Sequence, residues 1–237
     1  MIHRKKNTEV NLPPGPKNWE DLWEIPEELT KSKRGESFLL ANEQLEDGSR
    51  ILGFSSDTAL ELMKNSDDWE ADGTFAAVAS TPFNQAYVIF VKKSKISVPC
   101  TFFLLPNKRK STYIWMFEIL SRRIPNGPRF FHADFEVAVI SALQEIYTGT
   151  EVSFCNFHWS QALERNIKSH GLGSYINKRL DLQLFVRSLW SLIFLPADDF
   201  AMAFEKIIED TPLMDEDDEA PEEERESYNQ GVKGFLI

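Results

Sequence analysis

Two acidic residues stand where carboxylates can hold a metal ion. Asp72 lies in the segment "DDWEADGTFAAVAS" (67–80), where an Asp-Gly pair interrupts an extended, apolar run. Asp134 ends the short segment "RFFHAD" (129–134). Carboxylate oxygens suit hard divalent cations such as Mg²⁺, and two such ions can activate a nucleophile and stabilise the leaving oxygen of a phosphodiester. That chemistry requires elements that bring the two acids together.

Each acid also has an ordinary structural explanation. Asp72 and Gly73 fit a hairpin turn, and Asp134 fits the N-cap of a following helix with Glu136 in its first turn. A turn at 72–73 would, however, split an eleven-residue extended segment into two short pieces. The metal interpretation uses both acids in one topology, so we favour it for the pair. Gly73 is then interpreted as a small residue that lets a phosphate backbone approach.

The pattern of apolar residues predicts the elements that carry the acids. A hairpin over 38–56, turning at Asp47-Gly48, and a short helix over 56–66 come first. Three strands from Trp69 onward, with short polar breaks, predict an antiparallel meander. The segments that follow alternate between helix and strand: helix 111–124, strand 129–134, helix 135–147, strand 151–157 and helix 158–172.

The order β-β-β-α-β-α-β-α predicts an α/β fold with a mixed five-stranded sheet of RNase H-like order. Helical crossovers make the later strands parallel, and strand 129–134 is expected directly beside the first strand. Asp72 and Asp134 would then be neighbours. The chain divides into four parts: a flexible lead-in (1–36), the hairpin and short helix (37–66), the RNase H-like core (67–173), and a helical insertion (174–237) with an acidic loop at 214–227.

The net charge of −11 is concentrated near one end of the sequence. Residues 205–226 hold twelve Asp or Glu against two basic residues, a local net of −10, which leaves −1 for the remainder. The nearly neutral remainder contains basic clusters that are candidates for phosphate contacts, although charged loops are usually only solvated. These clusters are 91–95, 107–110, Arg122 with Arg123, and Arg165 with Lys168.

The two cysteines exclude a disulfide framework and fit a reducing compartment, the cytosol or the nucleus. The sequence has no apolar run long enough to cross a membrane, and its first residues lack the apolar stretch of a signal peptide. A membrane partner and secretion are therefore not expected.

Cys155 and His158 form a C-x-x-H pair at the end of the last predicted strand. Both residue types bind zinc, but a structural zinc site needs four ligands, and no second Cys-x-x-Cys or His-x-x-x-His pair occurs. A buried thiol and a helix-start histidine fit equally well. His132 is expected on the same side as Asp134, where it could support a metal ligand, and His170 is expected to be a structural residue at a helix end.

Four segments resemble successive blocks of the transposase domain of Mutator-like elements (MULE). The most informative motifs are W-x-x-D-G-T-F, L-L-P-N-K before a T-Y helix, D-F-E-x-A, and C-x-F-H-x-x-Q-A, and the resemblance covers about residues 60–175. It implies a nuclear enzyme with an RNase H-like core that cuts element ends and joins them to target DNA. It also implies an Asp-Asp-Glu (DDE) triad with Mg²⁺ or Mn²⁺, in which Asp72 matches the first acid and Asp134 the second. The family carries the C-x-x-H pair too, as a zinc site or as part of the active-site edge.

In this family a helical insertion precedes the helix with the catalytic Glu. The segment "ESYNQGVKGFLI" (226–237) resembles the approach to that helix, so we expect the catalytic Glu to lie outside this sequence, as in a truncated fragment. Glu205 and Glu209 belong to the expected insertion and are not expected to replace it.

Three functions follow from these observations: a DNA transposase domain for cleavage and strand transfer, a non-enzymatic DNA-binding or protein-interaction module, or a folded relic without activity. Transposases commonly pair two DNA ends, which leaves a homo-oligomer open.

Overall fold

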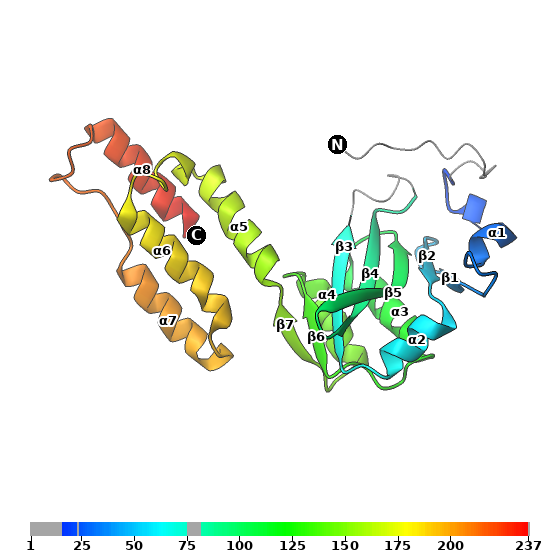
Figure 1. Cartoon of the computed structure of the whole chain (residues 1–237). Helices are drawn as coiled ribbons and strands as arrows, with labels where there is room; N and C mark the ends of the chain where they lie inside the picture. Colours follow the sequence, from blue (N-terminus) through cyan, green and yellow to red (C-terminus); the bar gives the residue numbers. More distant parts are fainter. Residues whose placement is uncertain (1–15, 23, 75–81, 237) are drawn as a thin grey trace. The chain divides into compact units, whose positions relative to one another are not determined.

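The computed structural model describes residues 16–22, 24–74 and 82–236 of the chain. It divides into two compact units, Met1–Val152 and Ser153–Ile237 (Figure 1). The sequence instead predicts a core that ends at residue 173.

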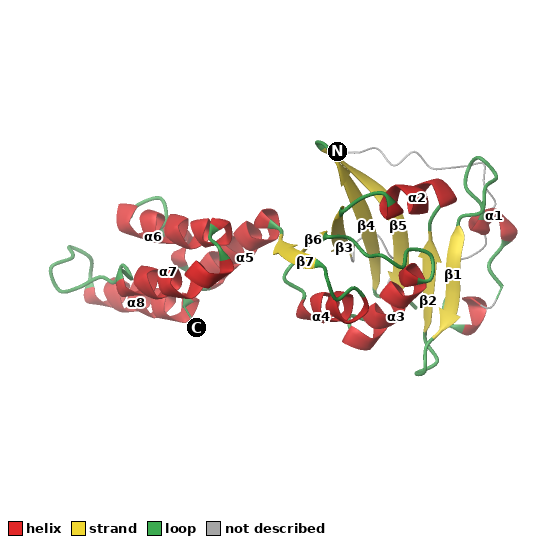
Figure 2. Ribbon diagram, turned by 90° about the horizontal axis from the view of Figure 1, so that it is seen from below, coloured by secondary structure: helices red, strands yellow, loops and turns green. Residues whose placement is uncertain are grey.

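The first unit is built on one mixed sheet (Figure 2). Its strands are β1 (Leu39–Gln44), β2 (Arg50–Phe54), β3 (Asp68–Thr74), β4 (Gln85–Lys93), β5 (Ile96–Leu105), β6 (Phe130–Ala133) and β7 (Glu151–Phe154), in the spatial order β1-β2-β5-β4-β3-β6-β7. The strands β3, β4 and β5 form the predicted antiparallel meander, and β6 pairs parallel to β3 as predicted. The α/β class is therefore confirmed.

The sheet contains seven strands among the described residues, whereas the sequence predicts five. The predicted hairpin accounts for two of the strands, because β2 pairs antiparallel with β5 and extends the sheet. The hairpin turns at Asp47-Gly48 as predicted, with Gly48 at a φ of 82°. The backbone N–H and the hydroxyl of Ser49 both donate to Asp47 and lower the pKa of its carboxyl group.

The strands bury every second side chain, as in β4, where Gln85, Tyr87, Ile89 and Val91 are buried. This side of the sheet, here called the core face, also carries Trp69 and Ala71 of β3. Three helices complete the same core cluster (Figure 2): α2 (Asp57–Lys64), α3 (Lys110–Ser121) and α4 (Val137–Ile146). Aromatic rings fill it, with Trp69 and Phe117 both packed edge-on against Tyr147.

The described part of the N-terminal segment packs on the sheet, where the sequence predicts a flexible lead-in. It contains the short helices η1 (Glu20–Leu22) and α1 (Glu27–Thr30). Leu22 is buried in a cluster with Leu52 and Phe83, and its carbonyl accepts a hydrogen bond from Asn42 Nδ2 at 3.0 Å. Residues 1–15 and Trp23 lie outside the described residues.

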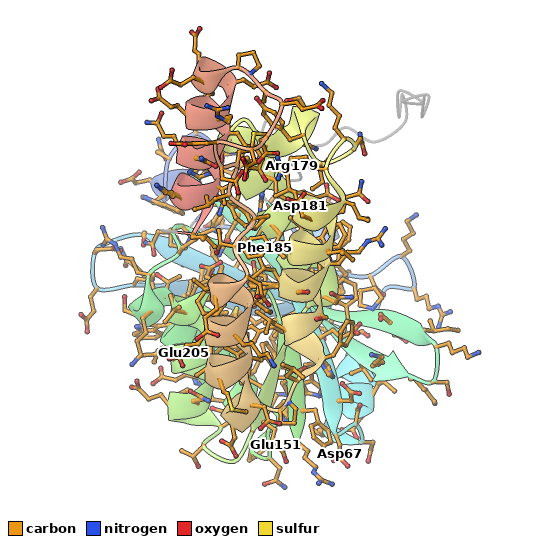
Figure 3. All side chains as sticks on the ribbon, turned by 90° about the vertical axis from the view of Figure 1, so that its left-hand side faces the viewer. Asp67, Glu151, Arg179, Asp181, Phe185 and Glu205 are labelled. Carbon is orange, nitrogen blue, oxygen red and sulfur yellow. The ribbon has the colours of Figure 1, made fainter. Side chains whose placement is uncertain are left out.

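The second unit is helical and has its own core. It contains α5 (Asn156–Ser169), η2 (Leu172–Ser174), α6 (Leu180–Ser191), η3 (Leu192–Phe194), α7 (Ala197–Glu209) and α8 (Glu222–Phe235). Arg179 at the start of α6 binds Asp181 (Figure 3). It also binds Asp218 at 3.0 Å, and its guanidinium lies 5.0 Å from the ring centre of Tyr228. Its hydrogen bonds lower the pKa of Asp181.

The acidic segment is a loop only in part. The sequence predicts a loop over 214–227, but α8 begins at Glu222, directly after Pro221 at its N-cap. Three consecutive glutamates then occupy the first turn, where negative charge interacts favourably with the helix dipole. The loop prediction is therefore wrong from residue 222 onward. None of the described helices has both the length and the apolar composition needed to cross a membrane.

Candidate functional site

Asp72 lies inside a strand and not at a turn. It pairs with Val88 across the antiparallel β3–β4 ladder, and Gly73 pairs with Tyr87. The hairpin-turn explanation of the Asp-Gly pair is therefore wrong, because both residues take part in regular strand pairing. The remainder of the predicted strand, residues 75–79, lies outside the described residues.

The register of β3 and β6 brings Asp72 and Asp134 level with each other. The parallel pairs are Asp68 with Phe130, Trp69 with Phe131 and Glu70 with His132, a constant offset of 130 − 68 = 62 residues. Asp134 directly follows β6, and the same offset, 134 − 72 = 62, makes it the counterpart of Asp72. Neighbouring strands lie about 4.8 Å apart. The backbone thus brings the two acids together at the end of adjacent parallel strands.

Both acids are on the side of the sheet opposite the core face, here called the acid face. Side chains alternate along a strand, so Asp72 points away from the side that buries Trp69 and Ala71. By the same alternation Asp134 shares its side with His132. Asp72 is exposed and Asp134 half-buried, so a cation could reach both carboxylates from solvent.

The charges of these acids contribute to a raised pKa of Tyr87. Burial raises the pKa of Tyr87 well above its usual value, and the nearby Tyr113 and the charges of Asp134, Glu136 and Asp72 raise it further. Burial is the largest of these causes, and the carboxylate charges add to it.

Asp134 is not the N-cap of the next helix, so that explanation of the residue is wrong too. The N-cap of α4 is Glu136, whose side chain makes no capping hydrogen bond. Its carboxylate instead accepts a hydrogen bond from Tyr113 Oη at 2.6 Å and one from Lys108 Nζ at 3.1 Å. Tyr113 Oη in turn accepts one from Gln85 Nε2 at 2.6 Å. Sequence reasoning missed this network, although a glutamine in an apolar strand is a visible signal for a buried polar partner.

Other polar residues of the acid face contact one another. Asp68 Oδ1 lies 2.7 Å from His132 Nε2, and Glu70 lies 3.4 Å from Lys92 Nζ. His132 therefore does share its side with Asp134 as expected, and the structure gives it a partner in Asp68. Its role beside a metal ligand stays a prediction.

The interpretation of Gly73 needs correction. A Cβ at this position would point to the core face, 3.3 Å from Gln85 Oε1 and 3.3 Å from Tyr87 Cδ2. The small residue is therefore explained by the close approach of these two core side chains. It does not make room for a phosphate beside Asp72, which points to the other side.

The C-x-x-H pair belongs to the helical unit. Cys155 is the N-cap of α5 and a free, partly buried thiol, and the ring of His158 lies 5.7 Å from that of Phe157. His170 is the C-cap of α5, and its Nδ1 lies 2.9 Å from the carbonyl oxygen of Asn166. Its expected position at a helix end is confirmed, whereas a zinc role of Cys155 and His158 stays a prediction.

Glu205 and Glu209 are on α7 of the same helical unit, with Glu205 labelled in Figure 3. Across the described ranges, no group of three or more His, Cys, Asp and Glu residues is placed to hold a metal ion. The acid pair therefore provides two carboxylates, a donor set whose chemistry suits a hard divalent cation.

Several basic residues that were candidates for phosphate contacts bind acids of their own chain. The pairs are Arg109 with Asp47 at 3.7 Å, Lys110 with Glu145 at 2.8 Å, Arg122 with Glu43, Arg123 with Asp57 at 2.8 Å, and Lys168 with Glu164 at 4.0 Å. Such exposed pairs are weak, so these side chains can exchange one anion for another at little cost.

The first unit is thus an α/β domain with two acids at the ends of adjacent parallel strands. Residues 69–162 match the family model of the MULE transposase domain. The chain therefore contains a MULE transposase domain, and the resemblance seen in the sequence is confirmed. A transposase domain implies interaction with DNA in general. A comparison with curated proteins gave no match.

Proposed function

We propose that the MULE transposase domain binds Mg²⁺ or Mn²⁺ through Asp72 and Asp134 and uses it to cleave DNA and transfer strands. The observation that carries this proposal is the β3–β6 register, whose offset of 62 residues, continued beyond the last pair, matches Asp72 with Asp134. In this proposal the domain is RNase H-like, its substrates are element ends and target DNA, and it works in the nucleus. The family match supports a transposase-derived function.

The chain's own residues would hold the cation and orient the DNA around it. A bound divalent cation supplies an activated water and neutralises charge on the phosphate. Asp72 is exposed at the acid face, so a phosphodiester can approach from solvent. The exposed basic residues of 107–110 follow β5 directly, and Lys108 lies next to Glu136, two residues beyond Asp134.

A second candidate function is a DNA-binding module without cleavage activity. It is favoured by the donor set, because the described part of the chain brings no third metal-binding acid to Asp72 and Asp134. Two carboxylates can bind a cation, but positioning two ions on a phosphodiester needs more ligands. The following two experiments separate the candidates.

Metal binding tests the acid pair directly. We expect Asp72→Asn to weaken Mn²⁺ binding by at least about tenfold in calorimetric titration, because it removes half of the charged ligands. The matched control is Asp67→Asn, which removes the same charge from an exposed position just before β3. Equal affinities of wild type and Asp72→Asn would show that Asp72 is not a ligand.

Strand nicking tests the reaction. If the domain cleaves DNA, the chain with Mn²⁺ nicks a supercoiled plasmid, and Asp134→Asn abolishes the nicking while DNA binding persists. If the wild type binds Mn²⁺ and DNA but leaves the plasmid intact under these conditions, the non-catalytic module is the better description.

A further inference from the structure

Four residues form a hydrogen-bonded network that ends two residues after Asp134. Gln85 of β4 donates to Tyr113 of α3, and Tyr113 and Lys108 both donate to the carboxylate of Glu136. We call these four residues the Glu136 network. It links β4, the loop before α3, and α3 itself to the turn between β6 and α4.

The Glu136 network is largely shielded from water. Gln85 and Tyr113 are both fully buried, and the side chain of Glu136 is 14% exposed. Partial burial of a carboxylate is costly unless hydrogen bonds and an opposite charge compensate it, and here each oxygen has one donor. A carboxylate held in this way is fixed in position and has little capacity left for a metal ion.

Glu136 is separated from Asp134 by Phe135 alone. The short segment between the last residue of β6 and the first of α4 is not fixed by a capping hydrogen bond, since the Glu136 side chain makes none. The backbone carbonyl of Glu136 accepts hydrogen bonds from two amides of the first turn of α4, and its carboxylate is held by Tyr113 and Lys108. Burial is the main cause that raises the pKa of Tyr113, and its hydrogen bond to Glu136 and the charges of Glu136 and Asp134 raise it further.

We propose that Glu136 is a positioning residue: held by Tyr113 and Lys108, it fixes the turn after β6 so that the carboxylate of Asp134 stays level with Asp72. This inference rests on the proposed metal site. It adds that the metal affinity of the acid pair is set from the core side of the sheet, by residues that do not touch the cation.

The decisive variant is Tyr113→Phe, because it removes one hydrogen bond to Glu136 and leaves every charge unchanged. Loss of a group that orients a metal ligand typically costs 10- to 100-fold in affinity, so we expect Mn²⁺ binding by the full chain to weaken at least about tenfold. Hydrogen exchange of the amides of residues 134–137, measured without metal, should become faster.

The matched control is Tyr147→Phe, which also deletes a buried hydroxyl, one that donates to the carbonyl of Ile124 at 3.0 Å. It should lower the melting temperature as Tyr113→Phe does, but leave the Mn²⁺ affinity and the exchange of residues 134–137 at wild-type values. If both tyrosine variants weaken metal binding equally, general loss of stability is the cause and the inference is wrong.

Substitutions at Glu136 distinguish a positioning role of this residue from an effect of its charge alone. Glu136→Gln keeps an oxygen that accepts from Tyr113, whereas Glu136→Ala keeps none, so Mn²⁺ affinity should fall in the order wild type, Glu136→Gln, Glu136→Ala. Equal losses in the two variants, with Tyr113→Phe like wild type, would mean that Glu136 acts only through its charge.

The experiments distinguish failure of the proposed metal site from failure of the proposed positioning role of Glu136. If wild type binds Mn²⁺ and Asp72→Asn does not, but Tyr113→Phe binds normally and exchanges normally at 134–137, only the positioning role is lost. If wild type binds no Mn²⁺, the proposed metal site and the inference that rests on it both fail. Accelerated exchange in Tyr113→Phe would then show only that the network orders the turn.

Discussion

Gly73 lies on β3, where an added side chain would meet two buried residues of β4. The sequence shows a glycine beside an acid, and only the pairing of β3 with β4 reveals that the missing side chain would point at Gln85 and Tyr87. For Asp72, by contrast, the sequence alone is enough to predict the local structure. Its place in a strand follows from the length of the extended segment, because a turn there would interrupt the pairing on both sides.

We predict that Gly73→Ala lowers the free energy of unfolding by about 1 kcal/mol, since the new methyl group crowds two buried neighbours. Mn²⁺ affinity should be unchanged, because the methyl group is on the core face. Urea denaturation and metal titration of the same samples measure the two effects. Gly149→Ala is the control, since its Cβ would meet nothing within 4 Å, and a loss of metal affinity in Gly73→Ala alone would restore the original interpretation.

At the scale of elements, the close approach of α8 to the end of α5 limits which residues fit between them. In the helical unit a Cβ on Gly231 of α8 would lie 2.5 Å from the carbonyl oxygen of His170, at the end of α5. Alanine normally favours a helix over glycine, so the sequence alone would suggest a stabilising change. The contact with His170 reverses that expectation, because backbone cannot move aside as easily as the end of a side chain.

We therefore expect Gly231→Ala to destabilise the protein by about 2 kcal/mol, within the range for overpacked positions. Gly173→Ala in η2 is the matched control, because its Cβ would meet only Lys168 Cγ at 3.9 Å. That change should stay within about 0.5 kcal/mol. Thermal and urea unfolding of both variants provide the measurement, and a neutral Gly231→Ala would show that α8 shifts readily.

On the scale of the whole chain, charge is the property that bears on DNA. The net charge is −11, and residues 205–226 account for −10 of it. A polyanion such as DNA is repelled by such a charge at low salt and less so as ions screen it. Exposed basic residues, as at 92–95 and 108–110, are the candidates for contacts with DNA.

We predict that the triple variant Glu216→Gln, Asp217→Asn and Glu219→Gln, with a net charge of −11 + 3 = −8, binds duplex DNA severalfold more tightly at low salt. The gain should vanish above roughly 0.15 M salt, where the Debye length is about 8 Å. Fluorescence anisotropy across a salt series gives the affinities. A charge-conserving triple variant, Glu216→Asp, Asp217→Glu and Glu219→Asp, is the control, and a gain there or at high salt would contradict the electrostatic cause.

The sequence by itself determined the α/β class, the three-strand meander, the helices after it and the family of the domain. These features depend on local periodicity, turn residues and short motifs, which neighbouring residues carry together. It also singled out Asp72 and Asp134, since an acid within an extended apolar segment is visible without a structure.

Only the tertiary structure decided what surrounds the two acids. The β3–β6 register, the joining of the β1–β2 hairpin to β5, and the bonds from Tyr113 and Lys108 to Glu136 unite residues that are distant in sequence. Local pattern cannot encode these contacts, because each depends on how separate elements pack. The surroundings of a site are set by packing, while its residues can be recognised from the chain.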